Sequence, residues 1–152
     1  MNKLYISSKN YRKFFLTENT TLTMGNKERC GILVGKRLNE EDFSVDYVIQ
    51  DINPIIQGKY KVVRSTKSVY PSLQKIINED YNVDYIGEWH THPFGPSQPS
   101  LCDLLTMENM INNPVYGNID WAIMILITGY KKHHVLLFNG GKPQKMNLII
   151  ST

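Results

Sequence analysis

The stretch GEWHTHPFGPSQPSLCD, residues 87–103, differs from the rest of the sequence in its density of coordinating side chains and prolines. It contains two of the four histidines, three of the seven prolines and one of the two cysteines. The residues before it predict a strand over positions 83–92, and the serine near its end predicts the start of a helix. Between them, PFGPSQPS predicts a stiff loop that cannot continue the strand. A strand, a tight loop and a helix start therefore bring several polar side chains together.

Two histidines of this stretch are spaced to share one ligand. His90 and His92 lie two residues apart in the predicted strand, so their side chains project to the same side. Their Cα atoms would be about 6.5 Å apart, which allows both imidazoles to reach one metal ion. After the loop, Ser100 is followed three residues later by Asp103, a pattern typical of a helix N-terminus. If the loop folds back, the Asp103 carboxylate reaches the two histidines.

This combination of ligands is typical of a catalytic zinc site. Two neutral imidazoles and one carboxylate leave the fourth position of the ion open for water, whereas structural zinc sites are closed by four protein ligands. Each part alone has a simpler interpretation: His-x-His arises by chance, Ser100 caps a helix, and Asp103 favours the positive end of a helix. Cys102, beside the site, is a minor rival to Asp103 as a ligand. The combination is far more specific than its parts.

The remaining pattern predicts one α/β domain over residues 1–152, with helices packed on a sheet. Strands are expected at residues 4–6, 30–36, 43–50, 60–64, 83–92, 119–128, 135–138 and 146–150. Helices are expected to begin near Ser8, Ser68 and Ser100. The first of them carries Tyr11, Phe14 and Phe15 on one side.

Three segments of the predicted sheet have distinctive sequence patterns. The strand at 43–50 alternates, which places its apolar residues on one face: Phe43, Val45, Tyr47 and Ile49. The run IDWAIMILIT at 119–128 is almost continuously apolar, which favours a strand buried on both faces. The last two strands are expected to be joined by a turn at residues 140–141. The pair His133–His134 is interpreted as structural or exposed, because adjacent residues of a strand face opposite ways.

Composition excludes several classes of function. Hydrophobic residues make up 41% of the chain, as in a folded globular protein. The net charge of +3, from 17 Lys and Arg against 14 Asp and Glu, is too small to argue for nucleic-acid binding. We expect neither a membrane span nor a signal peptide. Two isolated cysteines fit a reducing cytoplasm better than a disulfide framework.

The segment HTHPFGPSQPSLCD resembles the JAMM motif of the JAB/MPN metalloprotease family: His-x-His-Pro, a short spacer, then Ser-x-x-Asp. The upstream glutamate of that family has a counterpart in ERCGILVG, which supplies Glu28, Gly31 and Gly35. The resemblance extends over most of the chain. It implies a single JAB/MPN domain, a cytidine-deaminase-like α/β fold with a mixed central sheet flanked by helices.

The resemblance also implies roles for five residues. The zinc ligands, for one zinc ion per chain, would be His90, His92 and Asp103. Glu28 would be the acid/base on the zinc-bound water, and Ser100 would supply a hydroxyl to the developing oxyanion. These roles match what amide hydrolysis requires: an activated water, a proton carrier and a stabilised carbonyl oxygen.

The form GEWHTHP resembles small bacterial members of the family. That likeness implies a zinc-dependent isopeptidase acting after the C-terminal tail of a ubiquitin-like modifier or conjugated protein, in a bacterial conjugation or CBASS antiviral system. Its partners would be that modifier or conjugate and the activating and conjugating enzymes of the same operon. Alternatives are a peptidase that trims a sulfur carrier or peptide tail, and a catalytically silent scaffold. A non-haem iron oxygenase could use the same ligand triad but has no use for Glu28.

Glu88 is a rival to Glu28. It lies two residues before His90, so alternation places it on the same face as the histidines. That position suits an acceptor for the second N–H of a ligating histidine. A residue from a neighbouring strand can instead approach the metal-bound water from the other side. We therefore assign the acid/base role to Glu28. The position of Glu88 suits a histidine-orienting role, although the sequence does not determine its exact role.

Overall fold

A computed structural model describes residues 1–15, 25, 27–58, 62–94, 97–111 and 119–152. Its helices are α1 (Ser8–Arg12), α2 (Thr66–Glu79) and α3 (Leu101–Met110). Its strands are β1 (Lys3–Ser7), β2 (Cys30–Arg37), β3 (Asp42–Gln50), β4 (Ile56–Gln57), β5 (Val62–Val63), β6 (Asp84–Thr91), β7 (Ala122–Gly129), β8 (Lys132–Phe138), β9 (Gln144–Lys145) and β10 (Asn147–Ser151). The interleaving of helices and strands confirms the predicted α/β class.

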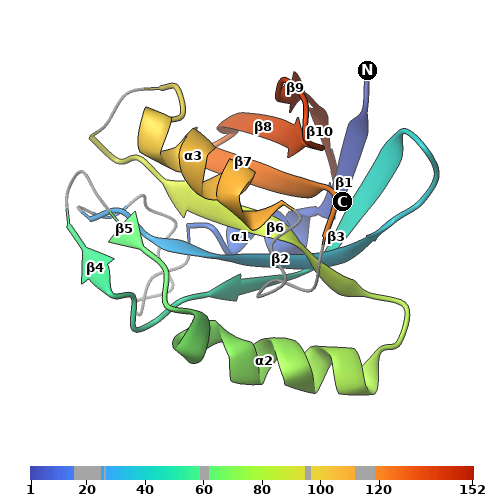
Figure 1. Cartoon of the computed structure of the whole chain (residues 1–152), viewed down its shortest axis with the longest axis horizontal. Coiled ribbons are helices and arrows are strands. Elements are labelled where there is room, and N and C mark those ends of the chain that lie inside the picture. The colour runs from blue at the N-terminus through green and yellow to red at the C-terminus, as the bar shows by residue number, and fades with distance from the viewer. Residues whose placement is uncertain (16–24, 26, 59–61, 95–96, 112–118) are drawn as a thin grey trace.

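Within the described residues, eight strands form one mixed sheet in the order β10-β1-β3-β2-β6-β7-β8-β9 (Figure 1). Strand β1 runs parallel to both of its neighbours, and β6 runs parallel to β7, whereas the other pairs are antiparallel. Strands β4 and β5 form a separate antiparallel pair. The predicted mixed central sheet is therefore confirmed.

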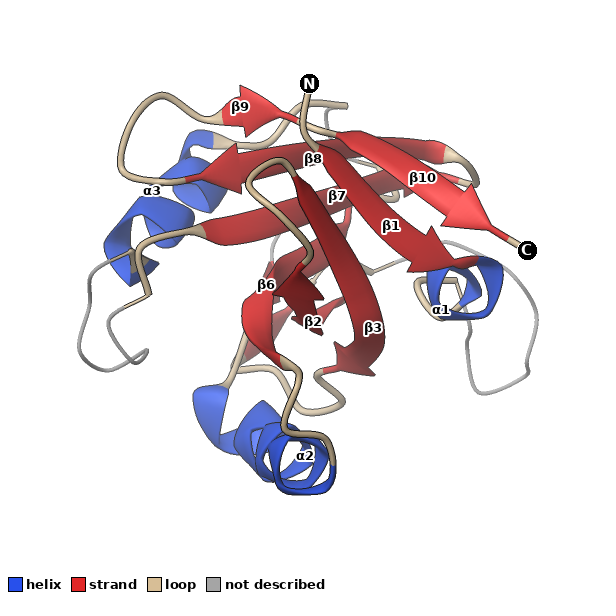
Figure 2. Ribbon diagram, turned by 90° about the vertical axis from the view of Figure 1, so that its right-hand side faces the viewer, coloured by secondary structure: helices blue, strands red, loops and turns tan. Residues whose placement is uncertain are grey.

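The sheet is covered on both faces (Figure 2). Tyr11, Phe14 and Phe15, from α1 and the turn after it, pack against residues of one face, including Leu33 and Trp89. On the opposite face, α3 contributes one apolar cluster and α2 a second. The alternating residues of β7 contact the α1 and α3 clusters in turn, which confirms the expected strand buried on both faces.

Strand β3 does not keep one apolar face. Phe43 and Val45 belong to the cluster beneath α1, but Tyr47 and Ile49 pack against the α2 cluster. The expectation that all four share a face was wrong. The cause is a bulge: Val34 pairs with Tyr47 but Gly35 pairs with Val45, so one β3 residue is skipped and the alternation changes phase.

The helices begin close to the predicted positions, with shifted caps. The N-cap of α1 is Ser7 rather than Ser8, and its side chain accepts a hydrogen bond from the Asn10 N–H. Helix α2 begins at Thr66, two residues earlier than expected, because Ser65 provides the cap. Helix α3 has the predicted Ser100 cap.

The C-terminal strands pair differently from the expected hairpin. Gly140 adopts a φ of +92° in the predicted turn, but the strand returning to β8 is the short β9. Strand β10 instead pairs with β1 at the far edge of the sheet. The strand expected at 60–64 is observed as β5, and its residues 60–61 lie outside the described part.

No helix in the described residues is long and apolar enough to cross a membrane.

Candidate metal centre

Strand β6 and the residue after it carry the two histidines of the motif. His90 pairs with Leu126 of β7, and the His92 N–H donates to the Ile127 carbonyl at 2.9 Å, so the extended chain continues past the end of β6. The two imidazole rings lie on the same side, with centroids 4.9 Å apart and ring planes inclined by 39°. Both residues are buried, His90 at 8% and His92 at 5% exposure. The predicted projection to one side is confirmed.

The first turn of α3 brings the carboxylate to these rings. The Ser100 side chain accepts from the Asp103 N–H at 3.1 Å, and the Ser100 N–H donates to Asp103 Oδ2 at 2.7 Å. This reciprocal capping box fixes the Asp103 side chain against the helix start. The predicted loop lies between His92 and Ser100, and its residues 95–96 are outside the described part of the chain.

The three side chains fit a tetrahedral metal ion. Asp103 Oδ2 lies 3.2 Å from His90 Nε2 and 3.5 Å from His92 Nε2. Ligands 2.0–2.1 Å from a tetrahedral zinc ion would be about 3.3 Å apart. All three candidate ligand atoms lie within 4.8 Å of one another. The two observed separations are therefore close to those of a zinc ligand set.

A buried nitrogen supports the same interpretation. His90 Nε2 is buried and makes no regular hydrogen bond among the described residues; its nearest acidic atom is Asp103 Oδ2, 3.2 Å away. Burial raises the pKa of Asp103, but contacts with His90 and Ser100 outweigh it and hold the pKa at about 2. The carboxylate is therefore ionised at neutral pH and suits a cation. Cys102, the rival ligand, is exposed and lies outside this group.

Glu28 approaches the group from another segment. Its Oε1 lies 3.7 Å from His92 Nε2, and the residue is only 4% exposed. It precedes β2 by two positions, so it lies in the segment leading into the strand rather than in the strand itself. Burial, opposed by His90 and reinforced by Asp103, raises its pKa to about 7. The structure thus brings Glu28, His90, His92 and Asp103 together.

Backbone contacts fix the position of Glu28. Its N–H donates to the Gly58 carbonyl at 2.7 Å, and its carbonyl accepts from Gln57 Nε2 at 3.2 Å. The following residue, Arg29, exchanges two hydrogen bonds of 2.9 Å with Thr91, through its N–H and its carbonyl. Sequence reasoning missed this role of Thr91, which lies between the two histidines.

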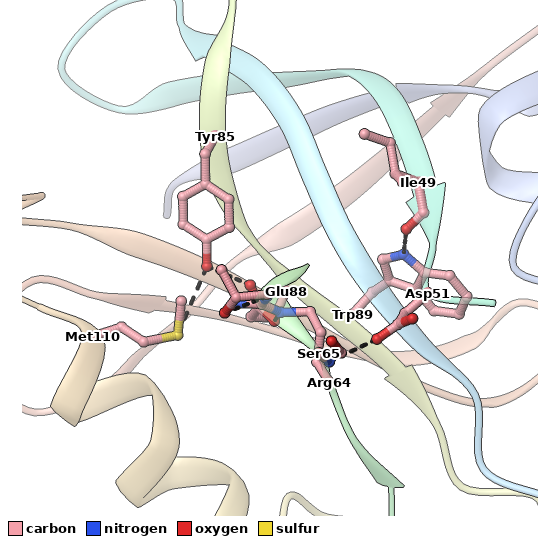
Figure 3. Close-up of polar contacts among 9 residues, drawn as sticks. Ile49, Asp51, Arg64, Ser65, Tyr85, Glu88, Trp89 and Met110 are labelled. Carbon is pink, nitrogen blue, oxygen red and sulfur yellow. Dashed lines mark hydrogen bonds and ion pairs between the residues drawn. The ribbon is translucent and has the colours of Figure 1, made fainter. Parts of the chain in front are cut away.

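Glu88 does not orient a histidine. One carboxylate oxygen forms an ion pair with Arg64 Nε, and the other accepts a hydrogen bond from the Tyr85 hydroxyl (Figure 3). Within the described residues, no hydrogen bond joins Glu88 to His90. The predicted orienting role was wrong. Arg64, 24 positions earlier in the chain, pairs with the carboxylate that was expected to accept from a histidine.

A pocket of about 230 Å³ adjoins the metal group. His90 and Asp103 form part of its wall, together with Arg64 and Glu88. Most of the remaining wall is apolar and includes valines from β5 and methionines from α3 and β7. No feature of the sequence indicated Arg64 or Tyr85 as part of this region.

The chain matches the family model Prok-JAB, described as prokaryotic homologs of the JAB domain, over residues 22–141. That range includes all five residues predicted for the site. Two curated proteins are also similar to part of this chain. The "Probable metalloprotease y4qB" of Sinorhizobium fredii is 33% identical over 87 residues, covering 51% of this chain and 52% of that protein. The "CD-NTase/cGAS isopeptidase" of Enterobacter hormaechei subsp. hoffmannii is 28% identical over 111 residues, covering 71% of this chain and 59% of that protein.

The fold also matches a solved structure. The solution structure of protein DSY2949 from Desulfitobacterium hafniense superposes with a TM-score of 0.67 at 16% identity, covering 97% of this chain and 92% of that one. Such a likeness supports the fold alone. The chain spans little more than half the length of the two curated relatives that it matches.

Proposed function

Because this chain belongs to the family of prokaryotic homologs of the JAB domain, we propose that it is a zinc-dependent isopeptidase or peptidase. Its substrate is the amide bond that follows the C-terminal tail of a ubiquitin-like modifier or conjugated protein. The observation that carries this proposal is the convergence of two histidines and one aspartate within 4.8 Å, with Glu28 beside them.

His90, His92 and Asp103 would hold the ion. Zinc bound there supplies Lewis acidity and lowers the pKa of a water molecule toward about 7. The three ligands contribute only one negative charge, since both imidazoles bind metal in their neutral form. A site of this composition keeps net positive charge near the scissile carbonyl, which is what amide hydrolysis needs.

Glu28 carries protons in this proposal. Its Oε1 is 3.7 Å from a ligand nitrogen, close enough to reach a water in the same group through a small side-chain movement. Glu28 accepts the proton of that water and delivers it to the departing amine. The contacts of its backbone with Gly58 and Gln57 hold it in place for both transfers.

Ser100 stabilises the negative carbonyl oxygen. Its Oγ already accepts a hydrogen bond from Asp103 N–H as a helix cap, and this uses a lone pair and not the hydroxyl proton. The hydroxyl therefore keeps its donor while serving as a cap. We assign that donor to the oxyanion.

The substrate tail fits beside strand β5. Val62 and Val63 line the pocket that also contains His90 and Asp103, and within the described residues β5 pairs only with β4. An extended tail that adds to this edge gains main-chain hydrogen bonds with little demand on its sequence. Apolar side chains are exposed on α3, which lines the pocket, and on the segment before β4, as expected for contact with a folded modifier: Leu101, Leu105, Ile52 and Ile55.

The name of the relative from Enterobacter hormaechei supports an isopeptide bond as the substrate. We place the protein in the cytoplasm, in a bacterial conjugation or antiviral defence system, with activating and conjugating enzymes encoded in the same operon. Genes for an adenylating and a conjugating enzyme next to this one would support that placement. Their absence would favour the trimming of a sulfur carrier or peptide tail instead.

Cleavage of a defined probe tests the activity. The probe is a hexapeptide tail whose terminal glycine is joined to a lysine Nζ of a fluorescent peptide, with a second version carrying Trp in place of that glycine. We propose that the tail end lies in a narrow channel beside the zinc, so zinc-loaded protein should cleave the glycine probe at least tenfold faster than the Trp probe. His92→Ala, which removes one predicted ligand, should cleave neither. Equal rates on both probes would refute the narrow channel, and an active His92→Ala would refute the site.

A further inference from the structure

The buried pair Arg64–Glu88 has no part in the proposed chemistry, yet it lies in the wall of the pocket beside the metal centre. Each side chain is only 12% exposed. Both oxygens of the carboxylate are occupied, one by Arg64 and the other by the Tyr85 hydroxyl. Removing either partner of a buried ion pair leaves the other without compensation, so the two side chains hold each other in place.

Arg64 joins two parts of the chain that are 24 positions apart in sequence. It directly follows β5 and precedes Ser65, the cap of α2. Glu88 lies in β6, two residues before His90. Their ion pair therefore ties the β4–β5 pair to the strand that carries the first histidine.

The base of the β4–β5 pair is fixed separately. Asp51, which is 1% exposed, accepts a hydrogen bond from the Ser65 N–H at 2.7 Å (Figure 3). It also accepts one from the Asn53 N–H at 2.9 Å. Its own N–H donates to the Cys30 carbonyl at 2.9 Å. The hydrogen bonds accepted by Asp51 fix the two ends of the segment that contains β4 and β5. The Arg64–Glu88 ion pair is a separate contact, at the end of β5 beside the pocket.

We infer that the Arg64–Glu88 pair is a positioning latch that fixes β5 against β6 and thereby sets the width of the substrate pocket. Arg64 is a positioning residue, because it acts through the placement of Val62 and Val63. The effect on catalysis rests on the proposed function, but the effect on β5 does not. Loss of the latch should weaken substrate binding without removing zinc.

A double-mutant cycle tests the latch. The variants are Arg64→Met, Glu88→Met and the double variant, with Arg64→Lys as the conservative change. Arg37→Met is the matched control, because Arg37 is exposed and is not part of the pocket wall: it donates to the carbonyls of Asn39 and Glu40 and lies over the Phe43 ring. Each protein is measured for zinc content, for KM and kcat on the glycine probe, and for hydrogen exchange of peptides covering residues 55–57 and 62–65.

We expect each single variant to raise KM about tenfold or more, with kcat changed less than about threefold and one zinc per chain retained. The double variant should be no worse than either single one, since each already breaks the same contact. Exchange at residues 62–65 should quicken about tenfold in all three, less in Arg64→Lys and not at all in Arg37→Met.

Three results would overturn the latch. Unchanged exchange at residues 62–65 in Arg64→Met would show that the pair does not hold β5. Additive effects in the double variant would show that the two residues act independently. Loss of zinc from Glu88→Met would assign Glu88 to the metal centre.

If the unaltered protein cleaves no probe, the proposed function fails, and the exchange measurements still decide the latch. If the methionine variants do not fold, Arg64→Lys and Glu88→Gln decide it through the same exchange measurement, and unchanged exchange in both would contradict it.

Discussion

The Glu28 carboxylate is placed by its own backbone. The N–H and the carbonyl of this residue are both bonded to the segment around β4, and its neighbour Arg29 is bonded to Thr91 between the two histidines. The side chain therefore has a fixed starting point close to the ligands. This arrangement is consistent with the acid/base role assigned to Glu28 from the sequence.

Glu28→Gln should keep one zinc per chain and lose turnover by about 10²-fold or more, because the amide cannot carry the proton. Zinc analysis and single-turnover rates check this. The matched change is Glu88→Gln, which removes a carboxylate from the pocket wall but leaves the proposed proton carrier in place, so its single-turnover rate at saturating probe should fall far less. An active Glu28→Gln beside an inactive, zinc-replete Glu88→Gln would reverse the assignment.

The metal-free protein should lose stability as the pH rises. Burial raises the pKa of Glu28 from 4.5 to about 7, so the folded state binds this proton more tightly than the unfolded state. The resulting stabilisation is fully present below about pH 4.5 and is lost as the pH rises through about 7. Chelator-treated Glu28→Gln should therefore be more stable than the unaltered protein at pH 8, by on the order of 1–3 kcal/mol, and similar to it at pH 4. Urea unfolding at both values measures the difference, and equal stability at pH 8 would contradict it.

The contacts of Glu88 could not be predicted from the sequence. Simple alternation places Tyr85, three residues earlier, on the opposite face of the strand. A bulge in β6 changes this: Leu33 pairs with Gly87, but Val34 pairs with Tyr85, so one residue is skipped. Tyr85 thereby reaches the same side as Glu88. Arg64 is 24 positions from Glu88, and no local pattern encodes a pairing of that range.

Helix α3 combines a structural cap with a proposed catalytic hydroxyl in Ser100. Ser100→Ala should cost about 1 kcal/mol of stability and lower kcat by about 10²-fold, because it removes both the cap and the oxyanion donor. Ser100→Thr keeps the hydroxyl and should retain most of both. Ser7→Ala is the matched control, since Ser7 caps α1 in the same way, with Oγ 3.1 Å from the Asn10 nitrogen. If Ser7→Ala and Ser100→Ala lose the same stability and neither loses turnover, Ser100 is only a cap.

Strand β2 needs a glycine where an indole crosses it. Trp89 donates from Nε1 to the Ile49 carbonyl at 3.1 Å (Figure 3). Gly31 of β2 pairs with Trp89 and lies beneath this contact. A Cβ on Gly31 would lie 1.8 Å from the Ile49 oxygen and 2.5 Å from Trp89 Nε1. Gly31→Ala should therefore destabilise the fold by about 1–3 kcal/mol or more in urea unfolding. Gly141→Ala, whose nearest atom would be 3.8 Å away, is the control, and equal stability of the two variants would contradict this account.

Elements with a strong local pattern were predictable. The apolar run that became β7, the capping box of α3 and the alternating start of β3 all reflect short-range chemistry. The features that were not predicted depend on contacts between residues far apart in the sequence. The pairing of β10 with β1 joins the two ends of the chain, and the β4–β5 pair is held by contacts to Glu28 and Glu88. Neither follows from periodicity.

The molecule as a whole places its metal group where the chain of β6 meets the first turn of α3. Residues of β5, α3 and the start of α2 line the pocket beside it. The motif residues were predictable as a set, because each is defined by short spacing. The pocket was not, since its wall combines β5, β6, β7 and α3. That residues 1–152 form one domain remains a prediction.

The most direct test of a zinc hydrolase at this site is the rate of probe cleavage as a function of bound zinc. Metal-stripped protein is titrated with zinc, and the single-turnover rate on the glycine probe is measured at each point, with His92→Ala in parallel. We expect no cleavage without metal and a linear rise that stops at one zinc per chain, while His92→Ala binds little zinc and stays inactive. Full cleavage by the metal-stripped protein, or full zinc content and activity in His92→Ala, would contradict the account.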